Sequence, residues 1–91
     1  MSVTVNIPQF LQPDTNKVKV AQVDGGTVGE CLNDLVQHYP RLKQLLFNNK
    51  NGKLHSYLDV FVNKKSSHPE GLARQVANGD ELHIINIIVG G

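Results

Sequence analysis

Apolar and polar residues alternate in the first part of the chain. Every second residue is apolar in residues 3–7, Pro8 ends the pattern, and the alternation returns in residues 17–20. Side chains of a strand point in turn to its two faces, so this period of two predicts two strands, each with one buried face. Residues 10–14, between them, include proline and aspartate, which favour turns. We therefore expect an antiparallel hairpin with a long connection, whose second strand is ended by residues 24–26.

A helix is predicted to begin at Thr27. Thr27 and Glu30 have the spacing of a capping box, in which each side chain accepts a hydrogen bond from a free backbone N–H at the helix start. Apolar residues then recur every three or four positions and form one face of the helix: Val28, Cys31, Leu32, Leu35, Val36 and Tyr39. Pro40 ends the helix because it disfavours helical geometry in the preceding residue. Residues 41–47 are expected to form one further short helical turn.

The second half of the chain returns to the period of two. Residues 57–63 predict a third strand, with aliphatic side chains facing inward and an outer face rich in aromatic side chains. Residues 64–71 are polar and include a proline, so we expect a loop or a short edge strand. A single helical turn within residues 72–76 and a last strand in residues 81–88 complete the prediction.

These elements predict the α+β class, with a mixed sheet of four to five strands packed on one main helix. No linker, repeat or low-complexity segment divides the sequence, so we expect a single domain over residues 1–91. If the first and last strands lie side by side and parallel, residues 88–91 project from one end of the sheet as a flexible tail.

The composition restricts the classes of function. The chain has 91 residues, of which 40% are hydrophobic, enough for one modest core but not for an elaborate buried active site. Nine Lys or Arg residues against eight Asp or Glu residues give no field strong enough to recruit nucleic acid or an anionic membrane. No apolar run is long enough to span a bilayer, and residues 1–4 lack the features of a signal peptide, so we expect a cytoplasmic protein.

Residue types that hold metals or catalyse reactions are sparse. Cys31 is the one cysteine, and the four histidines show no ligand spacing, so we predict no metal site, no redox site and no catalytic residue. Cys31 also lies on the apolar face of the predicted helix, where we expect an inert core thiol.

The sequence ends in Gly90-Gly91, directly behind a run of apolar residues. Glycine has no Cβ, so a diglycine tail can pass a narrow channel and carry its terminal carboxylate into the active site of another protein. The alternative interpretation is a frayed terminus, where glycine is tolerated without any function.

Several motifs resemble those of the β-grasp, ubiquitin-like sulfur carriers, the MoaD/ThiS family that includes the thiamin carrier and the small subunit of molybdopterin synthase. The resemblance covers the whole chain. It depends chiefly on the turn at residues 79–82, the last strand ending in Gly90-Gly91, and the helix start at residues 24–29. Residues 52–63 look most similar to the longer CysO-type carriers of cysteine biosynthesis.

The resemblance implies a protein substrate rather than an enzyme, with no cofactor of its own. An E1-like adenylating enzyme of the MoeB/ThiF type would use ATP to adenylate Gly91, and the adenylate would be converted to a thiocarboxylate that donates sulfide. Ile88, Val89 and Gly90 would enter the enzyme ahead of Gly91. The CysO-type branch implies a pyridoxal-phosphate (PLP) cysteine synthase as sulfur acceptor. A small carrier that visits several enzymes is expected to be a monomer.

A docking surface for the activating enzyme is predicted on the outer face of the third and last strands. If the alternate apolar residues of these strands face the core, then Phe61, Ile85 and Ile87 face outward. Outward apolar groups on neighbouring strands are typical of partner sites. The alternatives are that residues 41–47 cover these side chains, or that a bulge at Asn86 redirects the strand.

Two functions of other classes fit the same sequence. A ubiquitin-like modifier would use the same fold and tail to join Gly91 to lysines of other proteins, and a plain interaction domain would need no terminal chemistry. Among sulfur carriers, the sequence does not determine whether the acceptor pathway makes cysteine, molybdopterin, thiamin or another sulfur compound.

Overall fold

The computed structural model describes residues 2–87 of the chain. Its elements, in chain order, are β1 (Ser2–Asn6), η1 (Gln9–Thr15), β2 (Val20–Asp24), α1 (Val28–His38), α2 (Leu42–Leu46), β3 (Leu58–Val62), β4 (Lys65–Ser66), η2 (Gly71–Ala73) and β5 (Glu81–Asn86), where η marks a 3-10 helix.

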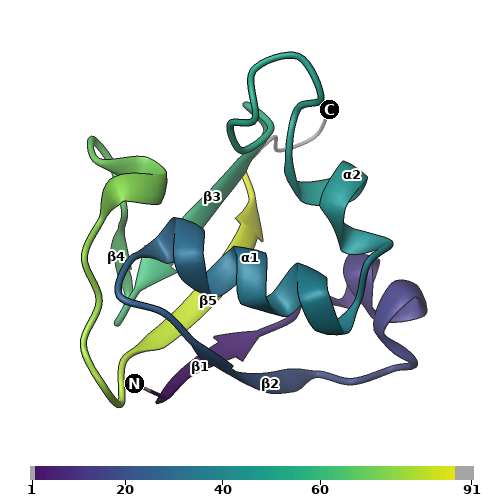
Figure 1. Cartoon of the computed structure of the whole chain (residues 1–91), viewed down its shortest axis with the longest axis horizontal. Coiled ribbons are helices and arrows are strands. Elements are labelled where there is room, and N and C mark those ends of the chain that lie inside the picture. The colour runs from purple at the N-terminus through teal and green to yellow at the C-terminus, as the bar shows by residue number, and fades with distance from the viewer. Residues whose placement is uncertain (1, 88–91) are drawn as a thin grey trace.

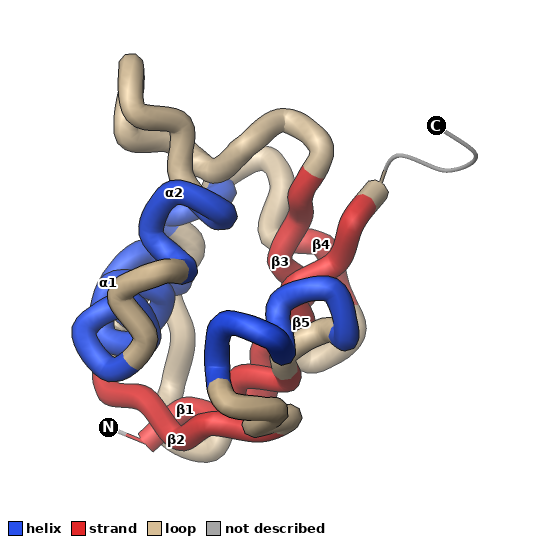
Figure 2. The backbone as a smooth tube through the Cα atoms, turned by 90° about the vertical axis from the view of Figure 1, so that its right-hand side faces the viewer, coloured by secondary structure: helices blue, strands red, loops and turns tan. Residues whose placement is uncertain are grey.

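The strands form one mixed sheet of five strands in the order β2-β1-β5-β3-β4, and α1 packs across one face of it (Figure 1). Figure 2 shows α1 and α2 together on the same side of the strands. β1 and β5 are parallel neighbours at the centre of the sheet, so the condition stated for the first and last strands is met. None of the helices formed by residues 2–87 has the length and apolar content needed to cross a membrane.

β1 and β2 form the predicted antiparallel hairpin, but β2 begins at Val20 rather than Lys17. Asn16 and Lys17 have φ angles of 53° and 65°, so the chain turns there in the left-handed region instead of extending. The connection is also more than a loop, because η1 occupies it and buries Leu11 in the core. The alternation of residues 17–20 therefore reflects a turn followed by a strand. The period of two alone does not distinguish this arrangement from a continuous strand.

α1 begins with the predicted capping box in a shifted form. The Thr27 hydroxyl oxygen accepts from the Glu30 N–H over 3.1 Å. The Glu30 carboxylate accepts from the Gly26 N–H over 2.7 Å, one residue before the cap position. The helix ends at His38, shortly before Pro40, as predicted.

The remaining elements follow the predicted order. α2 forms within residues 41–47, β3 within residues 57–63, and β4 is a short edge strand within residues 64–71. η2 is shorter than predicted, because it ends before Val76. β5 ends at Asn86, and the predicted final residue of that strand, Ile88, lies outside the described residues.

The core lies between the sheet and α1. Its sheet side consists of the apolar residues that were predicted to face inward, all of them buried: Val3, Val5, Leu58, Val60, Val62, Leu82 and Ile84. α1 contributes Val28, Cys31, Leu32 and Leu35, and α2 adds Leu42 and Leu46. The other face of the sheet therefore carries the alternate side chains of every strand.

Candidate functional site

The described chain ends just after β5, where the strand extends beyond one of its neighbours. In residues 2–87, β1 pairs with β5 no further than His83. β3 pairs with β5 as far as Asn86, and the Ile87 N–H then donates to the Tyr57 carbonyl oxygen over 2.9 Å. Residues 88–91 follow directly after this bond. The end of β5 is therefore held to the sheet mainly through β3 and the residue before it.

Tyr57 is itself fixed by its neighbours. The His55 ring stacks on the Tyr57 ring, with centroids 5.0 Å apart and planes 10° apart. His55 Nε2–H donates to the Gln44 carbonyl oxygen over 2.9 Å, and the His55 backbone N–H donates to Leu46 over 2.9 Å. These bonds connect the point where the tail begins to α2. This contact has no signal in the sequence, because Tyr57 makes it through its backbone carbonyl oxygen and any residue type could do the same.

A set of side-chain hydrogen bonds encloses the start of β5. The Asp80 carboxylate accepts from the Ala77 N–H over 2.8 Å and from the Asn63 side-chain amide over 2.9 Å. The Glu81 N–H donates to the Asn63 side-chain oxygen over 2.9 Å. Hydrogen bonds to the charged form, first from Ala77 and then from Asn63, lower the pKa of Asp80 from its ordinary value of 3.8.

Phe61, Ile85 and Ile87 lie on the outer face of the sheet. Ile87 directly precedes residues 88–91, Ile85 pairs with Asp59, and Phe61 pairs with His83, further from the tail. Phe61 and Ile85 are half-buried, and Ile87 is 44% exposed. Residues 41–47 do not cover them, because α2 packs against α1 and η1 on the inner side of the sheet. β5 also pairs in continuous register with β3 as far as Asn86, so no bulge redirects it. Both alternatives to an outward apolar group are therefore wrong.

Asp59 shows that part of the outer face of β3 is covered by the chain itself. Its side chain is buried, at 6% exposure. The carboxylate accepts from the Ser66 hydroxyl over 2.7 Å, from the Ser67 hydroxyl over 3.2 Å, and from the Val60 N–H over 2.7 Å. β4 and the residue after it fold over Asp59. The carboxylate therefore holds this edge segment against β3 and is not available to a partner.

Cys31 is a core thiol, as expected. It is fully buried on the inner face of α1. Burial, together with the nearby carboxylates of Glu30, Asp24 and Asp34, raises the pKa of the Cys31 thiol to about 11. A protonated, inaccessible thiol is a poor nucleophile at neutral pH, so Cys31 is no candidate for carrying sulfur.

The remaining predicted site residues, Ile88, Val89, Gly90 and Gly91, lie outside the described residues. Within residues 2–87, no group of three or more His, Cys, Asp or Glu side chains is arranged to hold a metal ion. What the described residues bring together is an outward apolar group on β3 and β5 beside the origin of a four-residue diglycine tail.

Comparisons with known proteins agree with this arrangement. The sequence matches the ThiS family over residues 5–91. The sulfur carrier protein CysO of Mycobacterium tuberculosis is 34% identical over 93 residues, and the match covers 100% of each chain.

Two solved structures extend the likeness to the fold. A chain in the crystal structure of the Amycolatopsis orientalis BexX/CysO complex has a TM-score of 0.88 and 33% identity, with coverage of 98% of this chain and 99% of that chain. SAMP1 from Haloferax volcanii has a TM-score of 0.85 and 26% identity, with 100% coverage of both chains. These likenesses confirm the predicted β-grasp fold and make this chain a homologue of a sulfur carrier protein.

Proposed function

The chain belongs to the ThiS family, and from that premise we propose that it carries sulfur as a thiocarboxylate on Gly91. The observation that carries the proposal is the likeness to the sulfur carrier CysO over the full length of both chains. The Gly91 carboxylate attacks the α-phosphorus of ATP, and pyrophosphate leaves. Hydrosulfide, or a donor equivalent to it, then attacks the acyl carbon of the adenylate, and AMP leaves. Adenylation is needed because a free carboxylate has no good leaving group.

The activating partner in this proposal is an E1-like adenylating enzyme of the MoeB/ThiF type. It binds ATP itself, so this chain needs no cofactor. Residues 88–91 span at most ~14 Å when extended, at about 3.5 Å per residue. The reactive centre of the enzyme therefore lies about that far from the Ile87–Tyr57 bond, and Ile88, Val89 and Gly90 occupy the channel between them.

The outer face of the sheet is the proposed docking surface for this enzyme. Phe61 and Ile85 lie on neighbouring strands, and Ile87 is the last described residue before the tail. An enzyme that seats on these side chains holds the origin of the tail at its channel entrance. Burial of half-exposed apolar groups favours the encounter, and the short tail then fixes the register of Gly91.

The sulfur acceptor is proposed to be a PLP-dependent cysteine synthase or an enzyme of related sulfur metabolism. Support comes from the CysO relative, and the Amycolatopsis orientalis complex supports the idea that carriers of this kind bind a second protein. We propose that the carrier is a monomer between these encounters, because both partners need the same tail.

Intact-protein mass spectrometry of the chain isolated from its native source tests the function. We expect a fraction of the protein to have one oxygen replaced by sulfur, and fragmentation to assign the change to Gly91. An alkylating reagent that traps thiocarboxylates should label that fraction and leave buried Cys31 unlabelled. The cognate enzyme and ATP should adenylate Gly91. If the adenylated chain is formed but no thiocarboxylate is ever found, the carrier function is wrong.

A ubiquitin-like modifier is the second candidate, and the likeness to a small archaeal modifier protein, SAMP1, favours it. Its first step, adenylation of Gly91, is the same. The outcome differs, because a lysine amine of another protein attacks the acyl carbon and forms an isopeptide bond. The same isolation therefore separates the two functions, since conjugates retain the C-terminal peptide of this chain, residues 75–91 after trypsin, on a lysine of the other protein.

A further inference from the structure

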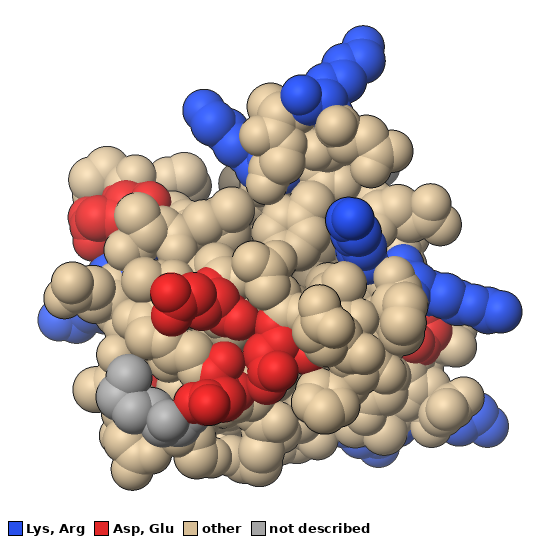
Figure 3. Space-filling view, viewed as in Figure 1, with Lys and Arg blue, Asp and Glu red and all other residues tan. Residues whose placement is uncertain are grey.

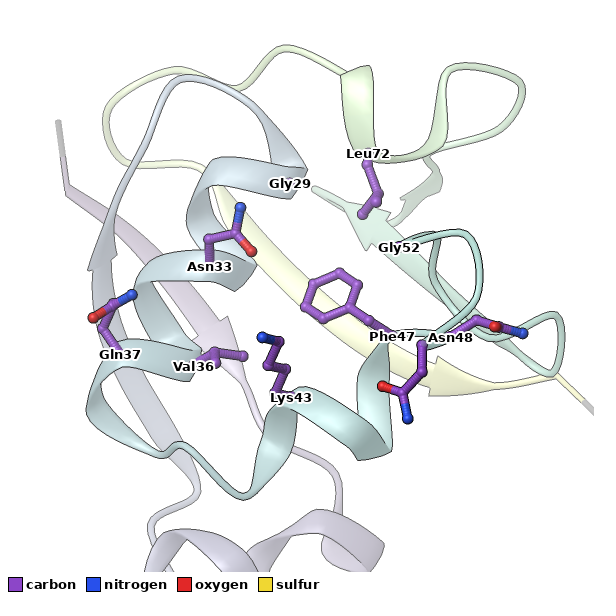
Figure 4. Close-up of a pocket in the computed structure, with 10 residues that line it drawn as sticks. Gly29, Asn33, Val36, Gln37, Lys43, Phe47, Asn48, Gly52 and Leu72 are labelled. Carbon is purple, nitrogen blue, oxygen red and sulfur yellow. The ribbon is translucent and has the colours of Figure 1, made fainter.

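A groove of about 610 Å³ lies on the helical side of the molecule, between α1, α2, η2 and the loop at residues 48–52. Figure 4 shows its main side chains. Val36 and Phe47 come from α1 and the end of α2, and Leu72 enters from η2. All three are only partly buried by the rest of the chain. The groove is thus an apolar surface that the protein itself leaves incompletely covered.

Polar side chains also line the groove, and Asn33 and Lys43 are two of them. Asn33 of α1 points into the groove, and Lys43 of α2 extends toward α1 between Val36 and Phe47 (Figure 4). No ion pair joins Lys43 to a carboxylate in residues 2–87. Lys43 is therefore a cation beside apolar side chains, without a counter-charge from residues 2–87.

The segment that contains α2 and the 48–52 loop carries no negative side chain. The sequence has no Asp or Glu in residues 35–58, whereas that segment holds Arg41, Lys43, Lys50 and Lys53. Of these four, Lys43 lines the groove and Lys50 belongs to the 48–52 loop, whereas Arg41 and Lys53 line other hollows. In Figure 3, Lys and Arg side chains project from the upper and right-hand parts of this face.

The acidic side chains of α1 are engaged elsewhere. Glu30 accepts from the Gly26 N–H and Asp34 accepts from the Asp24 N–H over 2.9 Å, at the junction of β2 and α1. The groove wall formed by α2 and the 48–52 loop is therefore complementary to negative charge.

The groove also lies close to the origin of the tail. Its outer wall, the 48–52 loop, stands at the end of the sheet where β3 begins and β5 ends (Figure 1). The Tyr57–Ile87 bond is at the same end. A protein that draws in the tail has to place its channel entrance against this end of the molecule, within reach of the groove.

We propose that this groove receives an acidic segment of the activating enzyme, as a second contact separate from the outer face of the sheet. The inference depends on the proposed function. An acidic protein segment fits the groove better than a free phosphate or nucleotide does, because Lys43, the one cation in the described lining, lies beside the apolar side chains of Val36, Phe47 and Leu72, which a small anion would leave uncovered. A segment with carboxylates and apolar side chains pairs with Lys43 and covers Phe47 in one binding event.

Charge reversal with a matched control tests the proposal. The test variant is Lys43→Glu with Lys50→Glu, and the control is Lys64→Glu with Lys65→Glu, which makes the same change of charge at the start of β5. All four lysines are exposed, so both variants should fold, and thermal unfolding checks this. Adenylation is followed as ATP–pyrophosphate exchange by the cognate activating enzyme, at low and high salt.

For the test variant we expect the KM for the carrier to rise about tenfold at low salt, with kcat and the KM for ATP unchanged. The difference from wild type should shrink at high salt, and the control should stay within about twofold of wild type. Equal effects in both variants, or no effect in either, would overturn the groove contact. The proposed function would still be supported in that case, provided that the wild-type chain is adenylated. A changed KM for ATP would assign the cations to nucleotide binding instead. Absence of wild-type adenylation would contradict the proposed function itself.

Discussion

The beginning of β5 pairs with a strand on each side, whereas its end pairs mainly with β3. At the beginning, β1 and β3 both pair with the strand, and the Asn63 and Asp80 side chains bond across the turn that precedes it. At the end, pairing with β1 has stopped, and the Ile87–Tyr57 bond is the last backbone contact before residues 88–91.

This difference separates two tasks within one strand. The enclosed beginning contributes Leu82 to the core and so helps to hold the fold. The end carries Ile85 and Ile87 on the outer face and leads into the diglycine tail. A change near the beginning is therefore expected to alter stability most, and a change near the end is expected to alter chiefly the proposed chemistry.

The largest effect is expected from lengthening the tail by one alanine after Gly91. Loading of Gly91 should be abolished, because the reactive carbonyl is replaced by an internal peptide and the new terminus is out of register. The midpoint of urea unfolding should stay at the wild-type value. Intact-mass measurement after incubation with the activating enzyme and ATP checks the first expectation, and loading of the extended chain would contradict the proposed role of Gly91.

Leu82→Ala should have the largest effect on stability. Leu82 is fully buried near the beginning of β5, and a buried leucine cut back to alanine costs about 3 kcal/mol of unfolding free energy. Urea unfolding followed by circular dichroism measures it. Ile85→Ala, near the other end, is the matched control and should cost clearly less because Ile85 is half-buried. Equal losses would remove the distinction between the two ends.

Phe61→Ser and Ile85→Ser should impair activation while the fold is kept. We expect the KM for the carrier in ATP–pyrophosphate exchange to rise about tenfold, equivalent to about 1.4 kcal/mol of lost apolar contact with the enzyme. Val20→Ser, an exposed apolar position on β2, is the control. Unchanged kinetics in well-folded Phe61 and Ile85 variants would refute the docking surface.

Asp80→Ala should lower the free energy of unfolding by about 1 kcal/mol at neutral pH, because the Ala77 N–H and the Asn63 amide lose their acceptor. The pKa of Asp80 is lowered in the folded state, so its stabilising effect is present above the ordinary pKa of 3.8 and is lost as the pH falls through the folded value. Urea unfolding of wild type and variant should therefore converge in acid. Loading of Gly91 should not change, and a loading defect would show that the two ends of β5 are coupled.

The smallest effect on loading is expected for Cys31→Ala, a residue at neither end of β5. Removing the buried sulfur should cost about 1 kcal/mol of stability and leave loading intact. Since the pKa of the thiol is raised to about 11, its labelling by iodoacetamide should also be slow in the folded wild type. Loss of loading in a stable variant would give Cys31 a role in sulfur transfer.

Local patterns explain why much of the fold was predictable. Alternation identified the inner faces of β1, β3 and β5, because a strand with one buried face must place apolar residues at every second position. Spacing identified the start of α1, because the Thr27 hydroxyl satisfies a backbone group within the same turn. The start of β2 was predicted too early. Polar and apolar residues still alternate at residues 17–20, although the backbone turns in the left-handed region at Asn16 and Lys17.

The candidate site also has features that the sequence predicted and features that it did not. The outward position of Phe61 and Ile85 follows from the alternation that buries their neighbours. The burial of Asp59 does not, because it depends on Ser66 and Ser67, which reach it only when β4 folds back along β3. The groove beside Lys43 is likewise formed by four separate segments and has no sequence signature.

By itself, the sequence determined the order of the elements, the faces that they bury and the diglycine tail, because each depends on residues close together in the chain. Tertiary structure decided that β5 passes beyond β1, that Tyr57 accepts the last described backbone bond of the chain, and that a groove lined by Lys43 lies beside that end. These features depend on strand register and on loops that meet across the fold. Such long-range placement is set by how the whole core packs, and no short pattern of residue types contains it.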